Sequence, residues 1–147
     1  MNWEDLSYEN EARDQKFDTL KAYRQSKLCN ILFTRELARR LENSSVTVNA
    51  LHPGVVLTEL GRYMGDVFGW RISFLMRLLY PIILFTLKSP WYGAQTTNYC
   101  AVAPELSSAS GCYFSDCKEK RILPHGADAQ DATKLWEISQ QLSGVLD

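Results

Sequence analysis

The sequence lacks an excess of charge of either sign and lacks a recognisable metal-binding motif. Its 147 residues carry 16 Lys and Arg against 17 Asp and Glu, which gives a formal net charge of −1. Nucleic-acid binding needs a sustained positive surface, so we expect no nucleic-acid partner. The four cysteines form no Cys-x-x-Cys pair, and neither histidine stands near them at a metal-ligand spacing. We therefore expect no metal and four reduced thiols, as in a protein that faces the cytosol.

The sequence also lacks a long uninterrupted apolar run. The most apolar stretch, residues 72–87, contains Arg77 and Pro81. It falls short of the roughly 20 apolar residues that a membrane-spanning helix needs. Two interpretations stay open: a helix pair that covers a substrate pocket, or a segment that contacts a membrane surface.

The hydrophobic pattern predicts an alternation of helices and strands. Apolar residues recur at three- and four-residue steps in the helical segments, and the strand segments are short and β-branched or aromatic. The predicted helices cover 20–41, 89–102 and 128–142, and the predicted strands cover 46–51 and 112–114. A strand that follows a long helix favours an α/β fold with a parallel sheet, in which the strand over 46–51 would be buried.

The sequence also contains capping residues that mark the ends of these helices. Asp18 or Thr19 can cap the first helix, and Ser89 followed by Pro90 suits the start of the second. Gly144 is placed to end the last helix. These signals predict helix boundaries to within a few residues.

The sharpest chemical feature is Tyr23-Arg24-Gln25-Ser26-Lys27. Residues four apart on a helix share one face, so Tyr23 and Lys27 would lie one turn from each other. A phenol alone is a poor acid or base at neutral pH, and a neighbouring ammonium favours the phenolate. The pair could thus exchange a proton with an alcohol or carbonyl oxygen. The motif alone is weak, because a surface pair with a half-packed tyrosine has the same spacing.

The surrounding segments make the interpretation specific. The run 22–41, the strand and Pro-Gly turn over 46–56, the segment 111–118 and the segment 135–139 occur in one order. Together they resemble the catalytic helix, the following strand and turn, the last strand and the C-terminal helix of short-chain dehydrogenases/reductases of the retinol-dehydrogenase-like branch. The resemblance covers nearly the whole chain.

The resemblance implies a role for each matching residue. Tyr23 would donate or accept the substrate proton, and Lys27 would bind the nicotinamide ribose. Pro53, Gly54 and Val55 would line the nicotinamide pocket, and Thr58 would contact the carboxamide. The implied activity is an NADP(H)-dependent oxidoreductase, with NAD as the alternative cofactor, that interconverts a hydrophobic alcohol such as a retinoid and its aldehyde or ketone.

The family's Gly-rich pyrophosphate turn and its catalytic serine strand have no counterpart in the 147 residues. We therefore expect a single partial domain over residues 1–147. It would be the C-terminal half of a doubly wound, Rossmann-type parallel sheet, with about two strands and four or five helices. Such a half is incomplete on its own, and we expect little or no activity from it alone.

Two further uses of the chain stay open at this point. The helices over 20–41 and 89–102 could form a dimer surface, so that the chain acts as a docking partner for full-length subunits. The stretch 72–87 could make a peripheral membrane contact. The resemblance implies a membrane-associated protein of the endoplasmic reticulum or the mitochondrion, with the cytoplasm as the alternative. We interpret His52 as structural, because it stands at a strand end before the Pro-Gly turn.

Overall fold

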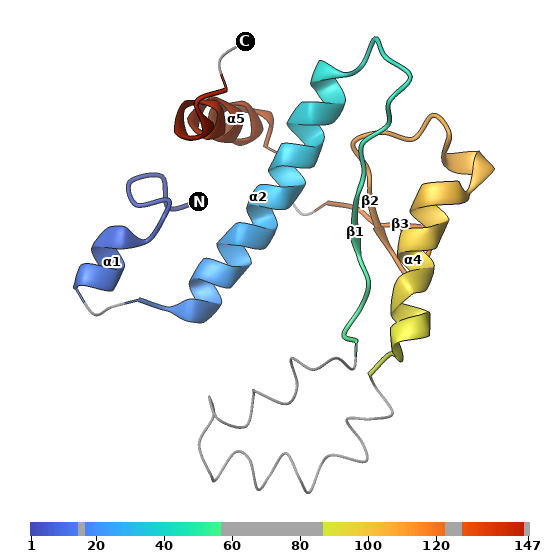
Figure 1. Cartoon of the computed structure of the whole chain (residues 1–147), viewed down its shortest axis with the longest axis horizontal. Helices are drawn as coiled ribbons and strands as arrows, with labels where there is room; N and C mark the ends of the chain where they lie inside the picture. Colours follow the sequence, from blue (N-terminus) through green and yellow to red (C-terminus); the bar gives the residue numbers. More distant parts are fainter. Residues whose placement is uncertain (15–16, 57–86, 123–127, 146–147) are drawn as a thin grey trace, which may run out of the picture. The chain divides into compact units, whose positions relative to one another are not determined.

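A computed structural model describes residues 1–14, 17–56, 87–122 and 128–145 (Figure 1). These residues form two compact units. The first unit comprises Met1–Ala50, Ala109–Cys112 and the chain from Arg121 onward, and the second comprises Leu51–Ser108 and Tyr113–Lys120. Each unit is described by itself below.

The first unit is built around the 22-residue helix α2 (Thr19–Arg40), which begins where the capping residue predicts. The Asp18 carboxylate accepts hydrogen bonds from the backbone N–H groups of Leu20 and Lys21. Such a cap satisfies donors that a helix N-terminus would otherwise leave unpaired. Of the two proposed capping residues, Asp18 is therefore the correct one, and Thr19 is the first helical residue.

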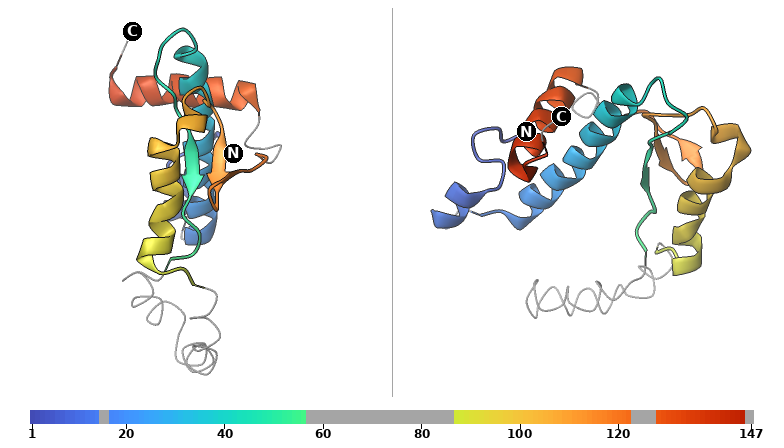
Figure 2. Two further views of the ribbon diagram at one scale, coloured as in Figure 1. Left: turned by 90° about the vertical axis from the view of Figure 1, so that its right-hand side faces the viewer. Right: turned by 45° about the horizontal axis from the view of Figure 1, so that its top comes forward.

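Helix α5 (Ala129–Ser143) crosses α2 in this unit (Figure 2). The two helices enclose a small core of Leu32, Ala132 and Leu135, each at most 5% exposed. Trp136 stacks on Phe33 at 5.3 Å between ring centroids. Asp128, predicted as the first residue of this helix, is its N-cap instead, and Gly144 ends the helix in the left-handed conformation, as predicted.

A buried carboxylate lies in the same interface. Glu36 is only 2% exposed and accepts hydrogen bonds from Arg39 and Arg40 on its own helix. The Thr133 hydroxyl on α5 also donates to this carboxylate, at 3.3 Å. The hydrogen bond from Arg39, with a further one from Arg40, lowers the pKa of Glu36 to about 2 against the desolvation that opposes it. The paired carboxylate therefore connects α2 to α5 and needs ionisation to do so.

The N-terminal residues, before α2, contain the short helix α1 (Glu9–Arg13). Gln25 of α2 holds this segment with both ends of its amide: Oε1 accepts from the Asn2 backbone N–H at 2.8 Å, and Nε2 donates to the Leu6 carbonyl at 3.2 Å. Tyr8, just before α1, is 5% exposed and takes the left-handed conformation.

The extended chain after α2 pairs with the segment before Tyr113. The Val48 carbonyl accepts from Gly111 N–H, and Ala50 N–H donates to the Cys112 carbonyl. The Asn49 side chain bridges the same two segments, since it donates to the Ala109 carbonyl and accepts from Cys112 N–H. The pairs advance in the same direction along both segments, as in a parallel arrangement.

The second unit contains the helix α4 (Pro90–Val102) and most of a three-stranded sheet (Figure 1). The sheet order is β1 (Ala50–His52), β2 (Tyr113–Ser115) and β3 (Lys118–Glu119). The Ser89 hydroxyl caps α4 and Pro90 is its first residue, as predicted. Phe114 on β2 is buried and meets Tyr99 of α4 edge-on at 6.2 Å.

The sheet corrects part of the sequence prediction. The first strand covers Ala50–His52 rather than 46–51, and it is not buried, since Val46 is 55% exposed and β1 is half-buried at most. Asn49 explains the shorter strand, because its side chain takes the Cys112 N–H that a regular ladder would use. Strand β3, which pairs antiparallel with β2, was not predicted.

The described residues thus form an α/β structure with four helices and one small sheet. A doubly wound parallel sheet stays a prediction. The predicted helix pair over 72–87 lies outside the described residues except for Leu87, as does Thr58. Among the described helices, none combines the length and the apolar character needed to cross a bilayer.

The core of the first unit predicts unequal effects for two leucines of α5. Leu135→Ala removes a side chain that is 5% exposed and should lower the free energy of unfolding by about 2–5 kcal/mol. Leu142→Ala is the control, because Leu142 is 81% exposed and should change stability by less than about 0.5 kcal/mol. Urea unfolding followed by circular dichroism measures both. Equal losses would show that α5 does not pack on α2 through Leu135.

Glu36 predicts a pH-dependent contribution to stability. Its folded-state pKa is about 2 against an ordinary 4.5, so its stabilisation is complete above about pH 5 and is lost as the pH falls toward 2. Glu36→Gln should lower the free energy of unfolding at pH 7 by about 1–3 kcal/mol, and the deficit should shrink across that acid range. Glu137→Gln on the exposed side of α5 is the control. A deficit that is constant between pH 7 and pH 3 would contradict the assignment.

Candidate active site

Tyr23 and Lys27 lie one turn apart on α2, as their spacing predicts. The Lys27 Nζ stands 5.2 Å from the centroid of the Tyr23 ring, a cation–π contact. Both side chains are exposed, with Tyr23 at 59%. Ser26, between them in sequence, turns its hydroxyl inward and donates to the Tyr23 carbonyl at 2.8 Å. The phenol and the ammonium therefore remain accessible to a ligand.

The buried side of α2 holds this pair in place. Leu28, one residue beyond Lys27, packs against the core of Leu32 and Leu135. The rotation of the helix about its axis is set by that packing, so the opposite face with Tyr23 and Lys27 is presented outward.

The second group of predicted site residues forms the turn after β1, in the second unit. Gly54 has a backbone φ of +86°, a conformation that residues other than glycine rarely adopt. Its N–H donates to Nδ1 of His52 at 2.9 Å, so His52 closes the turn, in line with the structural role expected for it. Pro53 and Val55 are exposed.

The turn is attached to the chain that leads into α4. Lys88 N–H donates to the Val55 carbonyl at 2.9 Å, and Val56 and Lys88 form an isolated parallel bridge. Val56 packs on Gly93 so closely that a Cβ built there would lie 2.6 Å from Val56 Cγ2. The glycine in the first turn of α4 is therefore required for the approach of the helix to this turn.

The Lys88 side chain continues from this bridge across the turn. A Cβ built on Gly54 would lie 2.9 Å from both Cδ and Cε of Lys88. The Lys88 ammonium pairs with the carboxylate of Asp116, which lies just after β2. The hydrogen bond from Lys88 lowers the pKa of Asp116. Sequence reasoning did not find either residue, because nothing in a separation of 28 positions signals a contact.

The predicted site residues thus fall into two described groups. Tyr23 and Lys27 are brought together in the first unit, and Pro53, Gly54 and Val55 are brought together in the second. Thr58 lies outside the described residues. Within the described ranges, no cluster of three or more His, Cys, Asp or Glu could hold a metal ion.

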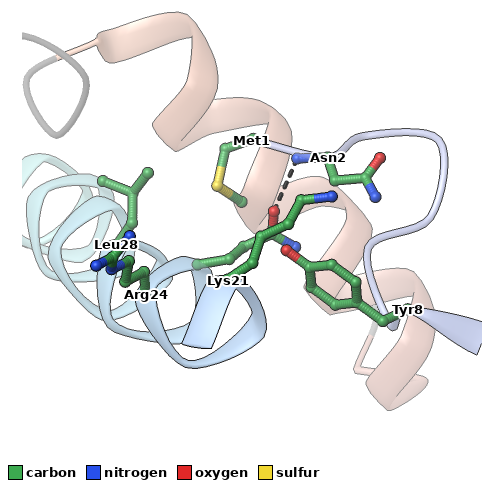
Figure 3. A pocket seen from close by; sticks show the side chains of 7 residues that line it. Met1, Asn2, Tyr8, Lys21, Arg24 and Leu28 are labelled. Carbon is green, nitrogen blue, oxygen red and sulfur yellow. Dashed lines mark hydrogen bonds between the residues drawn. The ribbon is translucent and has the colours of Figure 1, made fainter. Parts of the chain in front are cut away.

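A separate open cleft of about 480 Å³ lies between the N-terminal segment and the start of α2 (Figure 3). It is lined by Met1, Asn2, Tyr8, Lys21, Arg24, Gln25 and Leu28. Lys21 is already paired with Glu11 at 2.6 Å. Tyr23 and Lys27 do not line this cleft, so it is distinct from the candidate proton-transfer pair.

Comparison with known proteins points to one class, the retinol dehydrogenases. No protein-family model matches the chain. Individual relatives do match, over nearly its whole length. The chain is 46% identical to mouse (Mus musculus) retinol dehydrogenase 14 over 147 residues, which is 99% of the chain and 41% of the relative. It is 45% identical to human (Homo sapiens) retinol dehydrogenase 13, over 99% of the chain and 42% of the relative.

Bovine (Bos taurus) retinol dehydrogenase 12 is 42% identical over 90% of the chain and 39% of its own length. The chain is homologous to these enzymes, which confirms the resemblance to the retinol-dehydrogenase-like branch of the short-chain dehydrogenases/reductases. It spans about two fifths of the length of the relatives it matches.

The geometry of Gly54 predicts a substitution effect that depends on Lys88. Gly54→Ala should lower the free energy of unfolding by more than about 1 kcal/mol, because φ is positive and the new methyl group would meet Lys88. Gly144→Ala is the matched control, since Gly144 also has positive φ but nothing within 4 Å of a built Cβ. Chemical unfolding of both variants gives the comparison.

Adding Lys88→Ala should then recover part of the lost free energy of unfolding in the Gly54→Ala protein. It should recover none of it in the Gly144→Ala protein. Recovery in both, or in neither, would show that Lys88 does not lie over Gly54.

Proposed function

We propose that the chain carries the proton-transfer part of a nicotinamide-dependent oxidoreductase that interconverts a hydrophobic alcohol and its aldehyde or ketone. The observation that carries this proposal is the accessible Tyr23 phenol with the Lys27 ammonium one turn away. The pair occurs in a chain that aligns with retinol dehydrogenases from end to end.

In the proposed reaction, Tyr23 exchanges one proton with the substrate oxygen. During oxidation of an alcohol, the phenolate oxygen of Tyr23 takes the hydroxyl proton while the C–H bond breaks. A nicotinamide cofactor, when bound, would supply the acceptor for the hydride that leaves this carbon. During reduction the phenol returns the proton to the carbonyl oxygen. The Lys27 ammonium stands beside the phenol, 5.2 Å from the centroid of its ring.

The described residues suit the nicotinamide end of such a cofactor. Lys27 is exposed and would donate to hydroxyls of the nicotinamide ribose. Gly54 has no side chain, so its backbone could approach the nicotinamide ring closely. Pro53 and Val55 would line the nicotinamide pocket beside it. Thr58 would contact the carboxamide. We propose NADP(H), with NAD as the alternative.

The pyrophosphate end of the cofactor needs a Gly-rich turn at a helix N-terminus, and the 147 residues contain none. We therefore propose that these residues by themselves turn over little substrate and act together with a dinucleotide-binding segment. This agrees with a chain that spans about two fifths of its relatives.

The substrate class follows from the relatives, whose names specify retinol. We propose a retinoid or another hydrophobic alcohol or aldehyde, covered by the apolar stretch 72–87. The same stretch could contact a membrane surface, which would suit a protein associated with the endoplasmic reticulum or the mitochondrion.

A second candidate is a non-catalytic role as a docking partner through α2 and α4. The observation that favours it is the exposure of large apolar side chains on α4: Trp91 at 66%, Tyr92 at 62% and Val102 at 76%. Stable association of the chain with a complete family member, without any loss on Tyr23→Phe, would favour docking over catalysis.

The proposed reaction predicts that removal of the Tyr23 hydroxyl greatly lowers turnover. Tyr23→Phe, in a protein that joins these residues to a Gly-rich dinucleotide-binding segment, should lower kcat for retinaldehyde reduction by about 10²- to 10⁴-fold. The affinity for NADPH should stay within about twofold, because the ring and Lys27 remain. Stopped-flow absorbance at 340 nm measures turnover, and fluorescence titration measures binding.

Tyr92→Phe is the matched control, because Tyr92 is 62% exposed against 59% for Tyr23. It should leave both quantities unchanged. Full activity in Tyr23→Phe would remove the proposed role from this residue.

A further inference from the structure

The turn that would line the nicotinamide pocket depends on contacts from two other segments of the second unit. Gly54 adopts φ +86°, and the turn residues Pro53 and Val55 are exposed. An exposed turn of this kind fluctuates unless side chains from elsewhere hold it. The described contacts show which side chain does so.

Lys88 holds the turn at two points, one through its backbone and one through its side chain. Its backbone N–H donates to the Val55 carbonyl as part of the bridge with Val56. Its side-chain Cδ and Cε lie 2.9 Å from where a Cβ on Gly54 would stand. A backbone hydrogen bond alone would fix the Val55 end of the turn. The side chain adds a contact at Gly54, two residues earlier.

Asp116 fixes the far end of this side chain. Its carboxylate accepts from the Lys88 ammonium and from the Ser115 hydroxyl at 3.2 Å. Asp116 itself sits in the left-handed conformation at φ 57°, in the tight connection between β2 and β3. This connection is anchored to α4, since Cys117 N–H donates to the buried Thr96 hydroxyl at 3.3 Å.

We propose that the Lys88–Asp116 ion pair positions the Pro53–Val56 turn for the nicotinamide ring. In this arrangement Lys88 is a positioning residue: its stem covers Gly54, and Asp116 keeps the stem in place. This inference rests on the proposed function, because it assigns the turn to the nicotinamide pocket. It goes beyond that function by naming the residues that set the shape of the pocket.

The chemistry of the Lys88–Asp116 pair suits a positioning role better than direct contact with the cofactor. The Lys88 side chain is 30% exposed, and its charge is already neutralised by Asp116. A free lysine at this position would attract the cofactor phosphates, whereas a paired one contributes mainly geometry. The hydrogen bond from Lys88 lowers the pKa of Asp116, which favours the ionised carboxylate.

The test combines amide hydrogen exchange with cofactor affinity, in the protein used for Tyr23→Phe. Asp116→Asn and Lys88→Met, which keeps the stem and removes the charge, should each speed exchange at the Gly54 amide. They should weaken NADPH binding by about three- to fivefold, the effect of an exposed ion pair of up to about 1 kcal/mol. Lys88→Arg should restore both quantities to within about twofold of the unaltered protein.

Lys21→Met is the control, because it removes another ion pair, that with Glu11 in the first unit. It should change neither the Gly54 amide nor the affinity for NADPH. This separates a positioning effect from a general loss of stability, which melting temperatures of all variants record.

Two results would overturn the proposal, and a third would overturn the proposed function on which it rests. Unchanged exchange at Gly54 in both Lys88→Met and Asp116→Asn would show that the pair does not hold the turn. Faster exchange with unchanged NADPH affinity would show that the turn is held but does not position the cofactor. If the unaltered protein binds no NADPH, the proposed function fails, and the exchange data still report whether the pair holds the turn.

Discussion

The packing of α5 across α2 is the constraint on which the candidate site depends. Leu32 is fully buried between the two helices, and Leu28 packs on the same core. A helix that buries one face must expose the opposite face, so this core presents Tyr23 and Lys27 to solvent. The buried Glu36 strengthens the same interface, because its partners come from both helices. The chemistry at one end of α2 is therefore oriented by hydrophobic and ionic contacts nearer its other end.

The second unit differs from the first, because it holds an exposed turn in one conformation. Gly54 makes the left-handed backbone accessible, and neighbouring segments make it persistent. The His52 imidazole accepts a hydrogen bond from Gly54 N–H within the turn. Lys88, in the chain that leads into α4, donates its backbone N–H to the Val55 carbonyl. Each contact is weak alone. Together they fix the backbone of three residues that a cofactor ring could meet.

The sequence predicted the helices well because their determinants are local. Asp18, Ser89 and Asp128 each cap the helix that follows, and Gly144 ends the last one where expected. The strands were predicted less well because their limits depend on partners far along the chain. Asn49 takes the Cys112 N–H from the ladder, and no property of residues 46–51 alone reveals this. Strand β3 is two residues long and exists only through its pairing with β2.

The candidate site shows the same division between local and distant contacts. The spacing of Tyr23 and Lys27 is a helical property, so the sequence predicted their contact. The pairing of Lys88 with Asp116 joins a helix entry to a strand connection, and only the fold brings them together.

The most direct test of the account is a crystal structure of the protein with a nicotinamide nucleotide and a hydrophobic alcohol bound. We predict the Tyr23 phenol oxygen within hydrogen-bonding distance of the alcohol oxygen, about 2.6–3.2 Å, with the Pro53–Gly54 backbone against the nicotinamide ring. A nicotinamide bound elsewhere, with the Tyr23 phenol in solvent, would contradict the account.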